Sequence, residues 1–288
     1  MPSKHSILFF LLFLPNLICA QDTLLVAEPD TLLVVEPDTK WSQVKKDGKL
    51  IVNSILHVYS RPVHWKGDDW LTFGAITAAT GITHLYEHRL NTYFVDQGKN
   101  IPTSIQEFGF YFGKPLTNYG LTGSVYALGL ITNNDKIRHT GILLISSASA
   151  AGLIQSVSKT MVGRARPSAG EGKLSFHPIS KSPSYHSFPS GHAILSFTTA
   201  YAIGKQINNP YLKYAIYGIG MITPASRLWS GAHWLTDVGL GVAISVVVVD
   251  SIDKYLKNEY LKEGPLQEKA IKWQFKAGLN QIGIVGQF

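Results

Sequence analysis

The segment YHSFPSGHAI, residues 185–194, places a serine, a glycine and a histidine directly before an apolar run that is typical of a helix. Ser190 could be the ordinary N-cap of that helix, with His192 in solvent. The same residues also suit an anion site, because the first N–H groups of a helix are unpaired and carry partial positive charge. Gly191 would let a ligand approach the backbone closely, and His192 titrates near neutral pH, as proton transfer requires. This segment alone leaves both interpretations open.

A basic segment, KTMVGRARP (residues 159–167), precedes it at the end of another predicted helix. Lys159 and Arg166 would suit an anionic ligand, but cations at a helix C-terminus also interact favourably with the helix dipole. Arg164, between them, is assigned either to the rim of a site or to solvent. By itself this segment is a weak indication of function.

The third segment, SRLWSGAHWLTD (residues 226–237), brings Arg227, His233 and Asp237 together. If His233 opens a helix, Asp237 lies one turn later on the same face. Its carboxylate would then accept the Nδ1–H of the imidazole, fix the tautomer and leave Nε2 free to attack. An inconsequential His–Asp pair on a helix is the alternative.

Together the three segments resemble the signature of the type 2 phosphatidic acid phosphatase and vanadium haloperoxidase superfamily, over about residues 66–256. That signature is lysine, six residues, Arg-Pro; then Pro-Ser-Gly-His; then Ser-Arg, five residues, histidine, three residues, aspartate, and no position is substituted here. The resemblance implies that His233 attacks phosphorus and forms a phosphohistidine, with Asp237 orienting it. His192 would protonate the leaving alkoxide and then activate water. The residues implied to bind phosphate are Lys159, Arg166, Ser190, Gly191 and Arg227, and neither a metal nor a cofactor is implied.

Six apolar segments, separated by turns or charges, predict an all-α fold. They are residues 70–86, 116–132, 140–159, 192–207, 211–225 and 234–252. Their lengths suit helices rather than strands. We therefore expect a six-helix bundle of the phosphatidic acid phosphatase and haloperoxidase type. The longest break, residues 168–188, is rich in Ser, Gly and Pro and is expected to form a loop that acts as a lid or rim.

The N-terminus has the layout of a secretory signal. Lys4 supplies a positive end, residues 7–14 are apolar, and Ala20 offers a small residue for cleavage. The apolar run is too short to span a bilayer, so residues 1–20 are predicted to be a signal peptide, with a retained anchor as the alternative.

Two further segments lie outside the resemblance. An acidic eight-residue unit occurs twice in residues 22–39, and residues 21–65 are expected to form a spacer. Residues 257–288 are expected to be a basic tail. The stretch 253–276 carries six lysines and is predicted to be a solvated helical face.

Composition restricts the partners. The formal net charge of +7 favours anionic partners, but an exported chain without a basic–aromatic stripe is not expected to bind nucleic acid. The one cysteine, Cys19, lies in the predicted signal, so the mature chain would have no disulfide, thiolate metal site or cysteine nucleophile. We expect a protein exported in a bacterial envelope, periplasmic or membrane-associated. The apolar segments are borderline for a span of about 20 residues, which leaves integral, peripheral and soluble forms open.

These observations lead to one main functional hypothesis. The protein is predicted to be a metal-independent phosphatase of a phosphomonoester or pyrophosphate, in particular of a lipid such as lipid A, undecaprenyl pyrophosphate or phosphatidylglycerophosphate. A vanadate-dependent haloperoxidase and a non-catalytic phospholipid-binding protein are the alternatives. The remaining histidines considered are assigned to the surface or to loops: His84, His88, His139, His177 and His186, the last being nearest to the motif.

Overall fold

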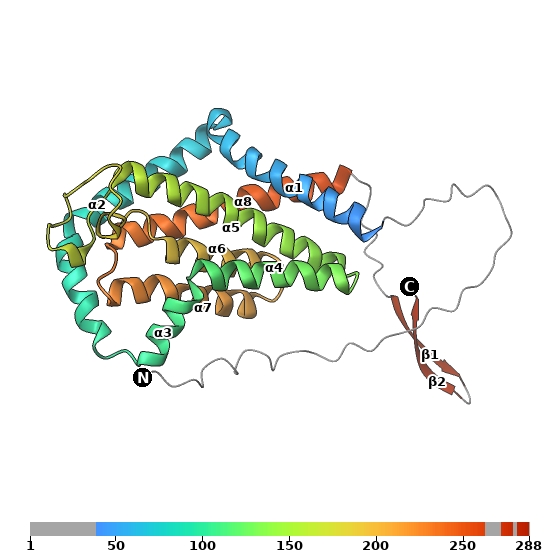
Figure 1. Ribbon diagram of the computed structural model, residues 1–288. Helices are drawn as coiled ribbons and strands as arrows, with labels where there is room; N and C mark the ends of the chain where they lie inside the picture. Colours follow the sequence, from blue (N-terminus) through green and yellow to red (C-terminus); the bar gives the residue numbers. More distant parts are fainter. Residues whose placement is uncertain (1–38, 263–271, 279–280, 288) are drawn as a thin grey trace. The chain divides into compact units, whose positions relative to one another are not determined.

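The computed structural model describes residues 39–262, 272–278 and 281–287 (Figure 1). The predicted signal peptide and the acidic repeat up to residue 38 lie outside the described residues. In the described part the chain forms eight α-helices. These are α1 (Lys40–Ser60), α2 (Gly67–Gly98), α3 (Thr103–Phe112), α4 (Pro115–Ile131), α5 (Asp135–Val162), α6 (Gly191–Lys205), α7 (Pro210–Trp229) and α8 (Leu235–Lys262). Single 3₁₀ turns occur at η1 (Arg61–His64), η2 (Pro167–Ala169) and η3 (Pro183–Tyr185).

Each of the six apolar segments lies in a helix, namely α2 and α4 to α8, so the all-α prediction is confirmed for residues 40–262. The count of six is wrong, because α1 and α3 are additional helices. Residues 40–60 were expected to belong to a spacer, yet α1 packs against α5 and α8. Val58 of α1 lies in the same apolar cluster as Ile142 of α5 and Leu256 of α8.

The C-terminal region also differs from expectation. The lysine-rich stretch 253–276 was predicted to be helical throughout, but α8 ends at Lys262. Further on, β1 (Lys272–Gly278) and β2 (Gln281–Gln287) pair as an antiparallel hairpin, with Lys272 opposite Gln287.

The core of the bundle lies where α5, α6 and α8 meet. Ile142 and Leu144 of α5, Ile194 of α6, and Val249 and Ile252 of α8 are fully buried in one cluster. Nearly every residue of α6 from Gly191 to Gly204 is buried, as expected for a helix that is apolar on all sides. Removing these side chains from water is the main contribution to the stability of the bundle.

The helix ends that carry the three motifs meet at one end of the bundle. The Ser190 N–H, at the start of α6, donates to the Asp237 carbonyl in the first turn of α8, at 3.0 Å. The Arg166 guanidinium, beyond the end of α5, donates to the Ala232 carbonyl between α7 and α8, at 3.1 Å. These contacts join segments that are far apart in the sequence.

The segment between α5 and α6 is held closely to the end of α5. Gly163 ends that helix in the left-handed conformation, with φ of 59°, and a Cβ built on it would lie 1.8 Å from the His177 carbonyl oxygen. Only glycine fits such a position. The His177 N–H in turn donates to the Gly163 carbonyl at 2.7 Å. Residues 168–188 therefore form an ordered loop beside the motifs.

Candidate active site

His233 lies just before α8 and is 2 % exposed. Its Nδ1 is 2.7 Å from the Ser187 carbonyl oxygen, so Nδ1 carries the proton and donates it, and Nε2 keeps its lone pair. Burial, followed by the positive charges of Arg166 and Lys159, holds the pKa of His233 well below its ordinary value. The imidazole is therefore uncharged at neutral pH, which is the form that a nucleophile requires.

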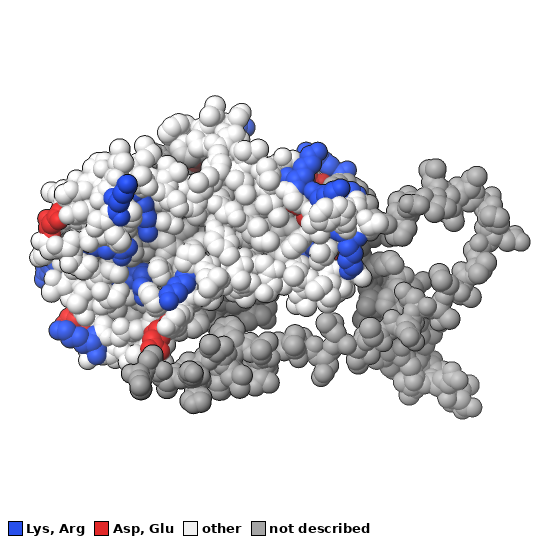
Figure 2. Space-filling view, in the orientation of Figure 1, with Lys and Arg blue, Asp and Glu red and all other residues white. Residues whose placement is uncertain are grey.

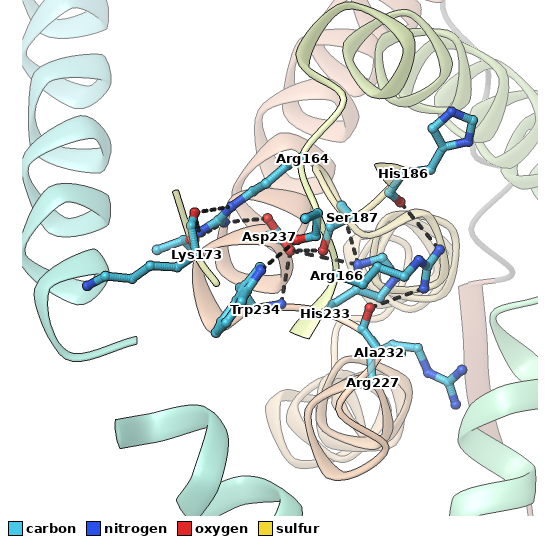
Figure 3. A network of polar contacts seen from close by, with 12 residues as sticks. Arg164, Arg166, Lys173, His186, Ser187, Arg227, Ala232, His233, Trp234 and Asp237 are labelled. Carbon is cyan, nitrogen blue, oxygen red and sulfur yellow. Dashed lines mark hydrogen bonds and ion pairs between the residues drawn. The ribbon is translucent and has the colours of Figure 1, made fainter. Parts of the chain in front are cut away.

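Asp237 does not accept the Nδ1–H of His233, contrary to the prediction, because the two groups are 3.9 Å apart (Figure 3). His233 precedes the helix instead of opening it, so its ring points to the loop at Ser187. The Asp237 carboxylate accepts instead from Arg164 Nη1 at 2.7 Å, the Trp234 N–H at 2.9 Å and the Ser187 hydroxyl. The bond to Trp234 is half of a capping box for α8.

Ser187 connects the two groups. Its carbonyl accepts from His233 while its hydroxyl donates to Asp237. The carboxylate therefore contacts the nucleophile through this loop residue, and its Oδ2 lies 3.9 Å from His233 Nδ1 without a hydrogen bond. Burial raises the pKa of Asp237, and Arg164 is the largest of the opposing influences that lower it.

Arg164 was assigned to a rim or to solvent, and this assignment is wrong. The residue is 3 % exposed, with Nη1 on Asp237 and Nη2 at 2.6 Å from Glu87 of α2. Figure 3 shows Arg164 and Arg166 on opposite sides of Asp237, with Arg166 on the side of His233. A guanidinium suits this place because its fork of donors can bind two carboxylates at once.

Glu87 is a member of the site that the sequence analysis missed. It is fully buried and accepts from the Thr236 N–H at 3.1 Å and from the Thr236 hydroxyl. His84, assigned to the surface or a loop, is partly exposed on α2, and its Nδ1 lies 2.7 Å from the Glu87 carboxylate. The available sequence signal was a histidine within the apolar segment 70–86 and a carboxylate, Glu87, directly after that segment.

Three cations from the motifs, Arg166, Arg227 and Lys159, lie near the two imidazoles of His192 and His233. Arg166 donates to three backbone carbonyls, those of Pro183, His186 and Ala232. Arg227 is buried and donates to the Ser226 hydroxyl through Nε at 3.2 Å. Burial, followed by the charge of Arg166, lowers the pKa of Lys159 to about 8, so its ammonium remains mostly charged at pH 7. In the described residues none of the three cations has a carboxylate within 4.0 Å, which leaves their charge available to an anion.

Ser190 and His192 face the same region with unpaired atoms. Ser190 is the N-cap residue of α6, but its side chain makes no capping hydrogen bond. Ser190 Oγ and His192 Nε2 are both buried without a partner among the described residues. Such atoms are rare in native proteins, and here they lie at the N-terminus of a buried helix. Burial lowers the pKa of His192 to about 4, and four cations contribute to the same shift: Arg227, Lys159, Arg166 and Lys114.

The junction between α3 and α4 was not anticipated as part of the site. Phe110 stacks on His192 with ring centroids 5.5 Å apart, and the Arg227 guanidinium lies 5.0 Å from the same aromatic ring. Lys114 Nζ lies 4.3 Å from the Phe110 ring and 4.4 Å from the Tyr111 ring. No motif pointed to these residues, because α3 itself was not predicted.

Three further histidines have side-chain contacts outside the two imidazoles described above. His139 stacks on Tyr260 at 3.8 Å, and burial lowers its pKa to about 4. His177 lies 2.8 Å from Glu171 in the loop, and His186 Nε2 is 2.7 Å from the Ser180 carbonyl oxygen. Across the described ranges, no group of three His, Cys, Asp or Glu side chains is arranged to hold a metal ion.

The described part of residues 39–262 is helical, and the helix ends that carry the three motifs meet around His192 and His233. Both imidazoles are uncharged at neutral pH, and the cations beside them have no carboxylate partner among the described residues. Residues 140–255 match the model of the PAP2 superfamily. The crystal structure of LpxE from Aquifex aeolicus is similar at 18% sequence identity and a TM-score of 0.45, over 59% of this chain and 95% of that one. No curated protein sequence matches the chain.

Proposed function

We propose that the protein is a phosphatase of lipid phosphates that works through a phosphohistidine on His233. The observation that carries the proposal is a pair of buried atoms, Ser190 Oγ and His192 Nε2, beside three cations; within the described part of the chain the two atoms have no hydrogen-bond partner and the cations no carboxylate partner. A tetrahedral oxyanion offers several acceptor oxygens and negative charge. It could therefore form hydrogen bonds with the two unpartnered atoms and balance the charge of the three cations. Neutral His233 supplies the nucleophile for the phosphorus atom.

In the first step, the Nε2 lone pair of His233 forms a bond to phosphorus, and the bond from phosphorus to the leaving oxygen breaks. The electron pair of that bond goes to the leaving oxygen, and His192 in its protonated form gives it a proton. The ammonium of Lys159 and the guanidiniums of Arg166 and Arg227 offset the charge on the remaining phosphoryl oxygens. Fixed charges of this kind are the main source of rate enhancement in phosphoryl transfer.

In the second step, water attacks the phosphohistidine. His192, now neutral, takes a proton from the water as its oxygen bonds to phosphorus, and the N–P bond breaks. Inorganic phosphate leaves, and His233 and His192 return to their starting forms. The Ser187 carbonyl keeps the imidazole of His233 in one orientation through both steps.

We also propose that the protein is exported and acts at a membrane surface. Figure 2 shows Lys and Arg gathered towards the two ends of the helical bundle, with a broad neutral surface between them on the visible face. Large apolar side chains are exposed along α2, among them Trp70, Leu71 and Phe73. Exposed apolar surface of this kind suits contact with lipid.

Two helices, α5 and α8, are long and apolar enough to cross a membrane, but about half of each apolar window is buried in the bundle. Core helices of soluble proteins meet the same criteria, so these two helices are only weak support for membrane association.

Release of inorganic phosphate tests the proposal. We expect the purified protein to release phosphate from a dispersed lipid phosphate with a chelator present, and His233→Ala to abolish release. Quenching in alkaline detergent during turnover should trap radioactive phosphate on the wild-type chain only. Phosphate release that survives His233→Ala, or binding of lipid phosphate without turnover, would contradict the proposed function.

A further inference from the structure

Lys114 is a fourth cation beside the candidate active site, and the proposed chemistry does not use it. It is the N-cap residue of α4, and its ammonium, which has only donors, cannot accept a capping hydrogen bond. The ammonium lies instead against the rings of Phe110 and Tyr111. Phe110 in turn stacks on His192, so one aromatic ring contacts both Lys114 and His192.

The backbone next to Lys114 also lies against His192. A Cβ built on Gly113 would be 2.8 Å from His192 Cβ and 2.6 Å from Thr223 Cγ2. This close approach holds the α3–α4 junction against the first turn of α6, which carries the imidazole that gives a proton to the leaving group. Lys114 is therefore on the side of the site where the leaving group must depart.

The charge of Lys114 is not balanced by a neighbouring acid. No carboxylate lies within ion-pair distance of its ammonium among the residues that the structure describes. Aromatic faces stabilise a cation by about 0.5–2 kcal/mol but leave its charge available to an anion. The ammonium also lowers the pKa of His192, by less than burial, Arg227, Lys159 and Arg166 do.

We propose that Lys114 binds an anionic leaving group, so that the site is built for a diphosphate, with one phosphoryl group on the three signature cations and the second on Lys114. This inference rests on the proposed function. His233 would bond to the terminal phosphorus, the bridging P–O bond would break, and its electron pair would remain on the departing phosphate. Lys114 stabilises that developing charge.

The state of His192 agrees with this substrate class. With a pKa of about 4, His192 is mostly neutral at pH 7 and is a weak source of protons in the ligand-free site. An alcohol leaves as a strongly basic alkoxide and needs that proton. A departing phosphate, with a second pKa of about 6, needs it far less.

Binding of inorganic pyrophosphate and orthophosphate to the full chain tests the inference. We expect pyrophosphate to bind the wild type more tightly than orthophosphate does. Lys114→Met should weaken pyrophosphate binding on the order of tenfold, as for loss of a charge-assisted contact, and orthophosphate binding by less than about twofold. Lys114→Arg should retain the preference. The matched control is Lys136→Met, which removes an exposed lysine from the other end of α5 and should change neither affinity.

Equal losses for the two anions in Lys114→Met, or no loss for either, would overturn the role of Lys114.

A second measurement compares turnover of a prenyl diphosphate with that of the monophosphate of the same prenol. Lys114→Met should lower kcat/KM selectively for the diphosphate. If the proposed function were wrong, the result would differ. Turnover would persist in His233→Ala, or neither lipid would be turned over, while the wild type would still bind pyrophosphate more tightly than orthophosphate.

Discussion

The buried side chain of Arg164 supports the candidate active site through its contacts with other residues. Its guanidinium joins Glu87 of α2 to Asp237 of α8, and Asp237 in turn accepts from the loop residue that orients His233. The Arg164 side chain does not reach the side where Arg166 and His233 lie (Figure 3). We therefore regard Arg164 as a positioning residue.

Replacing Arg164 by methionine should be strongly destabilising. Two buried carboxylates would lose their common cation, and breaking such a pair costs about 3–5 kcal/mol. Denaturant unfolding of Arg164→Met against the wild type measures the loss. In the background of Glu87→Gln, with one carboxylate neutralised, the same substitution should cost less. Equal costs in both backgrounds would show that Arg164 and Glu87 are not coupled.

His192 should link anion binding to pH. Burial and the surrounding cations hold its pKa at about 4, and a bound anion favours the imidazolium and raises that pKa. Sulfate keeps its double charge throughout this range, so its affinity should increase as the pH falls from 7 to 5, by up to about tenfold per pH unit. Calorimetric titration with sulfate measures this slope. His192→Gln should flatten it, and an unchanged slope in that variant would assign the proton to another group.

At the scale of elements, the α3–α4 junction fixes one wall of the site. Gly113 lies so close to His192 and Thr223 that a methyl group there must displace one of them. Gly123, in the middle of α4, has no heavy atom within 4 Å of the same position. The two glycines therefore provide a matched pair.

Gly113→Ala should lower kcat at least tenfold and destabilise the fold by about 1–3 kcal/mol, because overpacking shifts the backbone beside His192. Gly123→Ala should leave kcat unchanged and stabilise the helix by about 0.5–1 kcal/mol. Steady-state kinetics and thermal unfolding of both variants check this. Similar behaviour of the two variants would mean that the junction does not position His192.

The sequence predicted the helices that form the core better than those at its edge. Apolar runs identified α5, α6 and α8, because burial on most sides requires such runs. The helix α1 mixes lysines with apolar residues, and α3 has ten residues, so a search for long apolar segments missed both.

The same limit applies to the site. The three motifs named residues whose spacing is local, and the structure places these residues at one end of the bundle. Glu87 and Lys114 come from helices without a motif, and only packing brings them there. Asp237 was wrongly predicted to accept from His233 Nδ1. Helical spacing relates only these two residues, whereas the acceptor is the Ser187 carbonyl, which comes from a loop.

For the whole helical bundle, the distribution of charged and apolar side chains is the basis of the proposed contact with lipid. The ends carry Lys and Arg, while the first turns of α2 present an aromatic cluster in which the Trp65 and Trp70 rings are 5.0 Å apart. Phe73 belongs to the same cluster, at 5.4 Å from Trp65. Aromatic side chains suit the interface between water and lipid because they combine apolar area with a rigid shape.

The double variant Trp70→Ser with Phe73→Ser should therefore lose affinity for vesicles that contain phosphatidylcholine and anionic phosphatidylglycerol. Each exposed aromatic side chain that enters lipid contributes up to about 1.5–3 kcal/mol, so we expect a decrease of roughly tenfold or more. Flotation of the purified full chain with vesicles measures the partition. Thr72→Ser, on the same helical turn, is the matched control and should float like the wild type. Turnover of a short-chain soluble phosphate should be retained in the double variant, because the cluster does not contact the imidazoles. Undiminished flotation of the double variant would show that α2 does not carry the lipid contact.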